Sequence, residues 1–364
     1  MSKALKKLID INRLREFKNK LVGTGSAYVQ TAAVDQTIAG TKTFSKPIVG
    51  SVTGSSGSCT GNAATATKLA TARTIALSGA ATGTATGFDG SGNITIPVTA
   101  LASSAIRAQW YAAFPDGAEA HNAMWGGRDI TAAFNNGTVS TNIANGTFKD
   151  IFPGDYITKQ VTISGTAYTV NWVVADCDYW INKGDSGNDM TAHHVAIVPQ
   201  QPIFNAKMNS TNTTEGGYAG SEMYKNVIPA CATGIVNAFG SSHILTFRDS
   251  IVRTVNTSAI SSGVPFWTGA SSDWGWYDAQ CNLMCERMVY GMPAFSSSGW
   301  DAGVATRQFS AFRLSGKLIN YNRQWWWLRD VVSSALFANV GGNGGAGTHG
   351  ASFVVGVRPF ALLV

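Results

Sequence analysis

The stretch from residue 51 to residue 100 most constrains how this chain of 364 residues can fold. Of its 50 residues, 35 are Gly, Ala, Ser or Thr, so large apolar side chains are scarce there. Such a segment buries too little apolar surface to offset the conformational entropy that ordering costs. It is therefore either a disordered linker or a set of short strands that pack closely against identical chains.

Short periodic segments in and beside this stretch favour strands over a linker. The segments TFSKPIVGSV, RTIALSG and NITIPVTA each resemble a short strand bounded by turn residues. Packing against identical chains would supply the core that one copy lacks.

The composition changes after this region. All 11 tryptophans follow residue 105, whereas residues 24–104 contain none, so a globular domain is expected over 105–364. The chain is 45% hydrophobic, which is enough for a sizeable core. Only 13% of residues are charged, about half the usual share of roughly 25%. This profile suits extended β structure and extracellular particles better than a cytosolic metabolic enzyme.

The N-terminal segment carries most of the net charge. Residues 1–22 hold seven basic and two acidic groups, a balance of +5, against 20 basic and 19 acidic groups in the remainder. The spacing of Leu14, Phe17 and Leu21 predicts a helix over 1–23. A helix this short is marginal alone, so we expect it to dock on a partner or on its own copies. The alternative is a frayed basic tail. No basic face for nucleic acid is expected beyond this arm.

Cysteine content and hydropathy limit the cellular compartments in which the protein is expected to assemble. The five cysteines form an odd set that implies no disulfide framework and fits assembly in a reducing cytoplasm. We expect no signal peptide, and no run of 18 apolar residues predicts membrane insertion. A protein with an exterior-type composition and no secretion signal would leave the bacterial cell by lysis, which points to a virion component.

Residues 105–364 predict an α+β fold. Strands are expected in TFKDIFPGDYI, QVTISGTAYTVNWVVADCDYW and HHVAIVP. Helices are expected over 221–240, with a kink at Pro229, and over 278–291. Strands, then two helices, then further strands with long loops are typical of that class.

Three consecutive tryptophans begin the last part of the chain. On a strand, Trp326 would point one way and Trp325 and Trp327 the other, because side chains alternate between faces. The alternative is that all three lie in the core. An exposed indole stacks well on sugars and on protein groups, and Tyr321 and Arg323 lie close by in the sequence. We therefore interpret this end of the chain as a binding tip.

Two resemblances make the prediction more specific. The segments VDQTIAGTKTFSKPIVG, NAATATKLATARTIALSG and FDGSGNITIPV resemble shaft and collar motifs of bacteriophage tail-fibre proteins. Members of that family are typically homotrimers, which implies an elongated trimeric β shaft over 24–104. The segments MNSTNTTEGGYAGSEMY, GWYDAQCNLMCERMVYG, WWWLRDVVSSALFA and GASFVVGVRPF resemble the C-type-lectin-like tip domains of phage receptor-binding proteins, in particular the variable proteins of diversity-generating retroelements.

The second resemblance divides the C-terminal residues into two sets. The implied constant skeleton is Leu328, Arg329, Asp330, Phe337, Ala338, Ala351, Ser352, Gly356, Arg358 and Pro359. The implied displayed positions, to which Tyr321 and Arg323 are added as expected receptor contacts, are Trp325, Trp327, Leu336, Asn339, Gly341, Gly342, Asn343, Gly345, Gly347, Thr348, His349, Phe353 and Val355.

Other possible sites are weighed against structural roles. Asp176 and Asp178 would share one face of a strand and could form a glycosidase pair, which is the enzymatic alternative. The adjacent His193 and His194, and the cysteine pair at 281 and 285, are interpreted as structural, so no metal is expected. The glycine tract 341–350 lacks the spacing of a phosphate loop, and no cofactor is expected.

The combined prediction is a non-catalytic phage tail-fibre tip protein. Its partners would be two further copies of itself, other virion tail or baseplate proteins through residues 1–23, and a glycan or protein receptor on the bacterial surface. The alternatives are a surface-polysaccharide depolymerase and a purely structural fibre or baseplate protein.

Overall fold

The computed structural model describes residues 11–22, 39–41, 43–46, 69, 71–79, 81–84, 87–102, 106, 108–110, 113–256, 270–295 and 299–364. The chain divides into two compact units. The first comprises Met1–Ala72 and Asp89–Asn93, and the second comprises Arg73–Phe88 and Ile94–Val364.

The described part of the first unit contains one helix, α2 (Ile11–Val22). It lies inside the helix predicted for residues 1–23, and the first ten residues of that prediction fall outside the described ranges. Ile11, Leu14 and Phe17 are 66%, 63% and 62% exposed. The apolar stripe of α2 therefore has no cover from the described residues.

Three very short strands follow in the second unit. β1 (Ala76–Leu77), β2 (Ala81–Thr84) and β3 (Ala100–Leu101) form an antiparallel sheet in chain order. RTIALSG does contain a strand, whereas NITIPVTA contributes only its last residue to one, and TFSKPIVGSV lies partly outside the described residues. Several apolar side chains here stay exposed, namely Ile75, Leu77, Ile94, Val98 and Leu101. The described residues leave this apolar surface uncovered.

From residue 113 onward the structure mixes helices and strands, as predicted for an α+β fold. The helices are α4 (Ala118–His121), α5 (Thr131–Asn135), α6 (Thr138–Ala144), α7 (Gly217–Gly220), the π-helix η1 (Met223–Val227), α8 (Ile228–Phe239), α9 (Glu286–Tyr290), α10 (Gly299–Ala302), α11 (Ser310–Leu314) and the 3₁₀-helix η2 (Gly316–Leu318). The strands are β4 (Tyr156–Ile163), β5 (Thr166–Cys177), β6 (Val195–Pro199), β7 (Phe204–Ala206), β8 (Phe247–Val255), β9 (Ser271–Ala279), β10 (Asn282–Leu283), β11 (Trp326–Val331), β12 (Leu336–Val340), β13 (Ala346–Gly350), β14 (Val355–Val357) and β15 (Pro359–Leu363).

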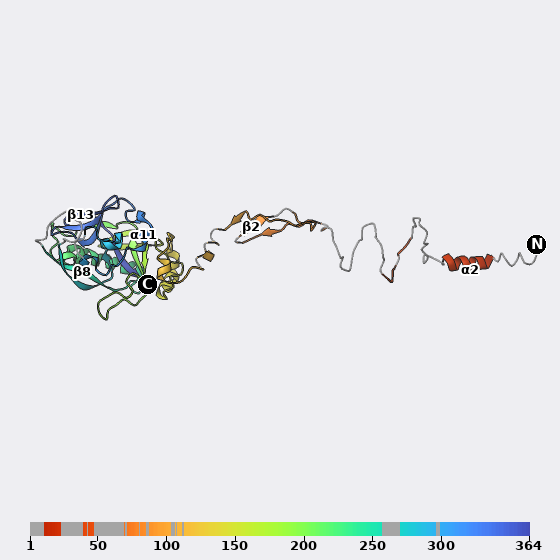
Figure 1. Cartoon of the computed structure of the whole chain (residues 1–364), viewed down its shortest axis with the longest axis horizontal. Helices are drawn as coiled ribbons and strands as arrows, with labels where there is room; N and C mark the ends of the chain where they lie inside the picture. Colours follow the sequence, from red (N-terminus) through yellow and green to blue (C-terminus); the bar gives the residue numbers. More distant parts are fainter. Residues whose placement is uncertain are drawn as a thin grey trace, which may run out of the picture. The chain divides into compact units, whose positions relative to one another are not determined.

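Two five-stranded sheets and one hairpin organise this part, which Figure 1 shows as one globular body around β8, α11 and β13. The first sheet is antiparallel, in the order β10-β15-β6-β5-β4. The second has the order β13-β12-β11-β14-β7 and is antiparallel except between β11 and β14. β8 and β9 pair only with each other.

Both faces of the first sheet are buried. Trp172 and Val174 of β5 belong to one hydrophobic cluster, which also holds Ile228 and Ile235 of α8. Val173 belongs to a second cluster, together with side chains of β11, β12 and α11. Successive residues of β5 therefore enter different cores, because a strand turns alternate side chains to opposite faces.

The β4–β5 hairpin and the helix α8 agree with the sequence prediction. QVTISGTAYTVNWVVADCDYW contains the second half of β4 and all of β5, and HHVAIVP ends in β6. The predicted kink at Pro229 takes the form of a change from the π-helix η1 to α8, with the proline in the first turn of α8. Gly240, with a φ of 97°, follows the last residue of that helix.

Two predicted elements are wrong. The helix expected over 278–291 is reduced to α9, because the residues before it complete β9 and form β10. Residues 281–286 are all buried, so they lack the exposed face of a surface helix. TFKDIFPGDYI is largely a series of turns, with Phe148 and Asp150 at positive φ, and only its last two residues enter β4.

Candidate functional site

An exposed stack of three rings lies at the C-terminal end of the chain. The ring centroids of Trp325 and His349 are 4.5 Å apart at an interplanar angle of 28°. Those of His349 and Phe353 are 4.9 Å apart at 17°. Trp325 is 46% exposed and Phe353 is 53% exposed. We call Trp325, His349 and Phe353 the aromatic strip.

The register of the second sheet positions this strip. His349 of β13 pairs with Phe337 of β12, and two residues earlier Gly347 pairs with Asn339. Gly347 and His349 lie on the same face of β13, since side chains alternate along a strand. A Cβ at Gly347 would lie 2.8 Å from Oδ1 of Asn339, so no side chain fits there without displacing the amide.

Gly342 constrains the indole from another side. A Cβ at this position would lie 2.7 Å from Nε1 of Trp325 and 3.0 Å from the carbonyl oxygen of Arg323. Any larger residue at 342 must therefore move the indole. The sequence interpretation placed Gly342 and Gly347 among the displayed positions, but a side chain at Gly342 would meet Trp325 and one at Gly347 would meet Asn339.

His349 is neutral at neutral pH. Partial burial lowers its pKa below the usual value of 6.5. The neutral imidazole stacks between the indole and the phenyl ring, and its centroid lies 6.5 Å from that of the buried Trp327. The exposed parts of Trp325 and Phe353 form the apolar surface of the strip. Such a surface suits stacking against a sugar ring or an aliphatic or aromatic protein group.

The structure sorts the predicted receptor contacts by exposure. The exposed positions are Tyr321, Arg323, Trp325, Asn343, Gly345 and Phe353. The half-buried positions are Leu336, Gly341, Gly342, Gly347, Thr348 and His349. The buried positions are Trp327, Asn339 and Val355.

The prediction that Trp327, Asn339 and Val355 are displayed is therefore wrong. Trp326 and Trp327 do point to opposite faces of β11, as alternation requires, but each face is covered by a hydrophobic cluster. The indole of Trp327 donates to the carbonyl of Ala206, 2.9 Å away on β7. Only Trp325, which precedes the strand, remains accessible.

The charged residues of the implied skeleton have structural partners. Arg329 forms its ion pair with Asp249 of β8, while Asp330 accepts a hydrogen bond from the backbone N–H of Glu286 at 2.7 Å. Arg358 is buried and donates to backbone carbonyls of Pro199, Gln200, Leu318 and Ile319. These groups hold β11 and β15 against the neighbouring loops.

A buried cluster of acidic side chains lies around Arg329. Asp249, Glu286, Asp301 and Asp330 are each at most 2% exposed, and Arg329 is the cation among them. Burial raises the pKa of Asp301 to about 7, although hydrogen bonds from Val331 and Ser271 oppose the shift. Burial, and then repulsion from Glu286 and Asp301, holds the pKa of Asp330 well above its usual range.

This cluster predicts a pH dependence of stability. Because its folded pKa is raised, the contribution of Asp301 is fully present below its unfolded pKa of 3.8 and is lost as the pH rises through about 7. We expect wild type to lose stability relative to Asp301→Asn between pH 5 and 8, by an amount on the order of 1–3 kcal/mol. Thermal unfolding of both proteins across this range measures the difference. Buried His121 and His194 titrate in both proteins, so their effect cancels, and parallel pH profiles would refute the prediction.

The two aspartates of the enzymatic alternative occupy different environments. Asp176 is fully buried at the end of β5, where it accepts hydrogen bonds from Arg307, Ser310 and Asn122. Asp178 follows the strand at a φ of 53° and accepts from His193 at 2.7 Å. Hydrolysis of a glycoside needs a carboxyl that can donate a proton and a second that is free to attack or to activate water. Because Asp176 already accepts these hydrogen bonds in the core, it is available for neither role.

The histidine and cysteine pairs also have structural surroundings. His194 is buried, donates from one ring nitrogen to the carbonyl of Ala192 and accepts from the N–H of Trp180 with the other. Cys281 and Cys285 are buried on different elements, and burial raises the pKa of both thiols. Among the described residues, no group of three or more His, Cys, Asp or Glu side chains could hold a metal ion.

Sequence reasoning missed two further surface features. Trp300 is 46% exposed and stacks on Trp274 of β9, with centroids 5.8 Å apart. A cavity of about 530 Å³ lies between η1, α8 and the end of β9. Both bring together residues that are distant in the sequence, so no local motif could have revealed them.

No protein-family model, curated protein or solved structure matches this chain. No helix within the described ranges combines the length and the apolar character needed to cross a bilayer.

Proposed function

We propose that this protein is the tip of a bacteriophage tail fibre and that it binds a receptor on the bacterial surface. The observation that carries the proposal is the aromatic strip, in which Trp325 is 46% and Phe353 53% exposed beside β11, a strand whose two faces are covered by hydrophobic clusters. Exposed aromatic side chains beside an arginine such as Arg323 are typical of binding hot spots. The phage assignment itself rests on the resemblance of the sequence.

The proposal includes a trimer whose shaft is built by residues 24–104. It is supported by the exposed apolar side chains around β1–β3, which one copy leaves uncovered. The bare apolar stripe of α2 supports attachment of residues 1–23 to another virion protein. Three linked tips would raise avidity by roughly 10²–10⁴ over a single site, so each contact can be weak.

The proposal also includes a C-type-lectin-like domain with a diversified face. Supporting positions are Asn343 and Gly345 in the β12–β13 turn and Phe353 after β13, which are exposed, whereas β12 is mostly buried. The encoding genome provides the test of diversification. A near-copy of the codons for about 320–358 next to a reverse transcriptase gene is expected, and without one the tip assignment stands but diversification does not.

Adsorption tests the receptor face directly. We expect Trp325→Ala and Phe353→Ala each to cost about 2 kcal/mol of binding, or roughly 30-fold in affinity per site. The measurement is a pull-down of host cells by the full-length protein. Trp300→Ala is the matched control, because this indole is also 46% exposed but lies outside the aromatic strip.

The outcomes separate the alternatives. Loss of cell binding in the strip variants alone supports a receptor face on the strip. Unchanged binding in both strip variants would contradict the proposal and favour a purely structural fibre protein. Release of sugar from purified envelope glycan, abolished by Asp176→Asn or Asp178→Asn, would instead favour the depolymerase.

A further inference from the structure

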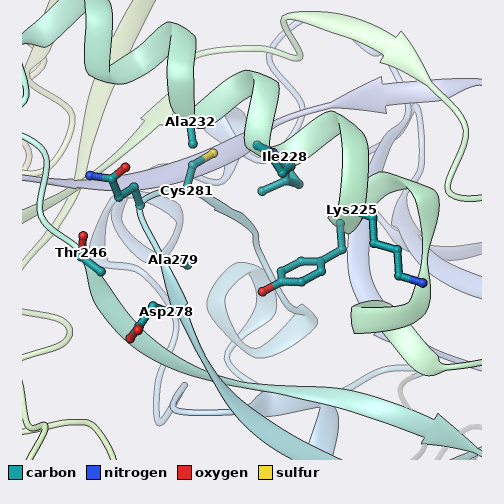
Figure 2. Close-up of a pocket in the computed structure, with 10 residues that line it drawn as sticks. Lys225, Ile228, Ala232, Thr246, Asp278, Ala279 and Cys281 are labelled. Atoms are coloured by element: carbon teal, nitrogen blue, oxygen red, sulfur yellow. The ribbon is translucent and has the colours of Figure 1, made fainter.

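The cavity beside η1 is a second concave site, separate from the aromatic strip. It has a volume of about 530 Å³, within the range of roughly 300–1,000 Å³ that small-molecule pockets occupy. Figure 2 shows Ile228 and Ala232 on α8 along one side, with Thr246, just before β8, and Asp278 of β9 on the other. None of its lining residues belongs to the strip.

A π-helix builds part of the wall. Tyr224 and Lys225 lie in η1, which continues directly into α8 at Ile228. A single π-helical turn within a helix is rare and often marks a functional site. The ring of Tyr224 is fixed by edge contacts with Tyr218 and Tyr277, at centroid distances of 5.3 and 5.9 Å.

Three polar side chains of the pocket are uncommitted. Among the described residues, no protein partner hydrogen-bonds the hydroxyl of Tyr224, the hydroxyl of Thr246 or the amide of Gln280. A second cavity, beside Asp178, differs, because its lining residues Arg307 and Ser310 already donate hydrogen bonds to Asp176. Hydroxyls and a primary amide can each donate and accept hydrogen bonds, so the three groups can donate to ligand hydroxyls or accept from them.

The apolar wall complements these groups. Ile228, Pro229 and Ala232 of α8 and Ala279 of β9 present aliphatic surface to the cavity. Cys281 also lines it, and burial raises the pKa of its thiol, so the thiol is neutral. A ligand that has one face of C–H groups and hydroxyl groups along its edge fits this arrangement of apolar and polar residues.

The charges at the rim argue against an anionic ligand. Asp278 is 67% exposed and makes one 3.3 Å contact with Arg248, which is also paired with Asp185. Figure 2 shows Lys225 directed away from Asp278 and Thr246. Asp278 is thus a largely exposed negative charge among the lining residues, and a carboxylate accepts hydrogen bonds from hydroxyls without needing a charged partner.

We infer that the cavity between η1, α8 and β9 binds a neutral saccharide unit. The aliphatic residues of α8 contact the apolar face of the sugar, while Tyr224, Thr246, Gln280 and Asp278 bond its hydroxyls. This inference does not rest on the proposed tail-fibre function, because it concerns binding of a sugar to the isolated protein.

The test is saturation-transfer NMR of the full-length protein with millimolar glucose, galactose, mannose, N-acetylglucosamine, maltose and lactose, and with glucuronate as the anionic probe. At least one neutral sugar is expected to bind, and glucuronate to bind more weakly. Tyr224→Phe and Gln280→Ala each remove hydrogen bonds and are expected to weaken binding about three- to tenfold. Tyr224→Phe keeps the ring that packs on Tyr218 and Tyr277.

A blocking variant and two controls locate the site. Ala232→Phe fills the cavity and is expected to abolish binding, whereas Asn237→Phe, at an exposed position on the same helix, leaves binding unchanged. The strip variant Trp325→Ala also leaves it unchanged. Should Ala232→Phe fail to fold, Tyr224→Phe and Gln280→Ala still decide the outcome.

Three results would overturn the inference: no neutral sugar binds, binding survives in Tyr224→Phe and Gln280→Ala at wild-type strength, or binding is lost only in Trp325→Ala. The last result would place the saccharide on the aromatic strip and leave the proposed function intact. A variant that loses cell adsorption but still binds sugar would show that the aromatic strip and the cavity act separately.

Discussion

Replacing Trp327 with alanine is expected to destabilise the protein by about 3–5 kcal/mol, whereas Trp325→Ala costs less than about 1 kcal/mol. Trp327 is fully buried and its indole N–H bonds the carbonyl of Ala206, so its loss leaves a cavity and an unpaired acceptor. Trp325 is 46% exposed and covers only part of the sheet. The two variants differ by two positions along the chain and carry the same chemical change.

Urea unfolding followed by circular dichroism measures this difference. Trp326→Ala should resemble Trp327→Ala, since Trp326 is also fully buried and bonds the carbonyl of Ile319. Equal free energies of unfolding for the Trp325 and Trp327 variants would show that β11 does not have two covered faces. A small effect at all three positions would contradict the packing of the whole sheet.

Arg358→Met is the second change with a large expected effect, a loss of about 3–5 kcal/mol in the free energy of unfolding. The guanidinium is 1% exposed and donates to four backbone carbonyls, and it lies 4.8 Å from the ring centroid of Trp326 and 5.2 Å from that of Phe312. Methionine fills the volume but leaves those carbonyls without their donor. The cost arises mainly from these unsatisfied acceptors.

Thermal and urea unfolding of Arg358→Met and Arg358→Lys provide the test. Lysine keeps the charge but lacks the planar fork of donors, so we expect it to restore only part of the loss. Arg323→Met is the control, because that side chain is exposed and its removal should change stability by at most about 0.5 kcal/mol. A neutral Arg358→Met variant would mean that these carbonyls find other donors.

Local sequence patterns predicted the elements whose information is local. Alternation in residues 160–180 predicted strands that form β5 and part of β4, and the helix predicted over 221–240, with a kink at Pro229, contains η1 and α8. Residues 278–291 were misassigned because an apolar run buried on all sides looks alike in a helix and in a short strand. Its β10 segment exists only through pairing with β15, which lies about 75 residues later.

The site was predicted where exposure follows from sequence position and missed where it depends on packing. Trp325 could be identified because three adjacent rings on a strand cannot all share one face. Burial of Trp327 could not, since it depends on β7 and the first hydrophobic cluster covering that face. Likewise, the partner of Arg329 is Asp249, 80 residues away, rather than the adjacent Asp330. The pocket beside η1 joins Tyr224 to Gln280 only through tertiary contacts.

The position of Gly342 beneath the indole has a consequence for how this protein can evolve. Asn343 and Gly345 in the same turn are exposed, and change there alters the outer surface without moving the frame. At Gly342 even one added methyl group reaches Trp325 first, so a mutation there re-aims the largest contact residue while its chemistry is preserved. Under the proposed receptor-binding function, substitution at this single codon would change how Trp325 is presented to a receptor.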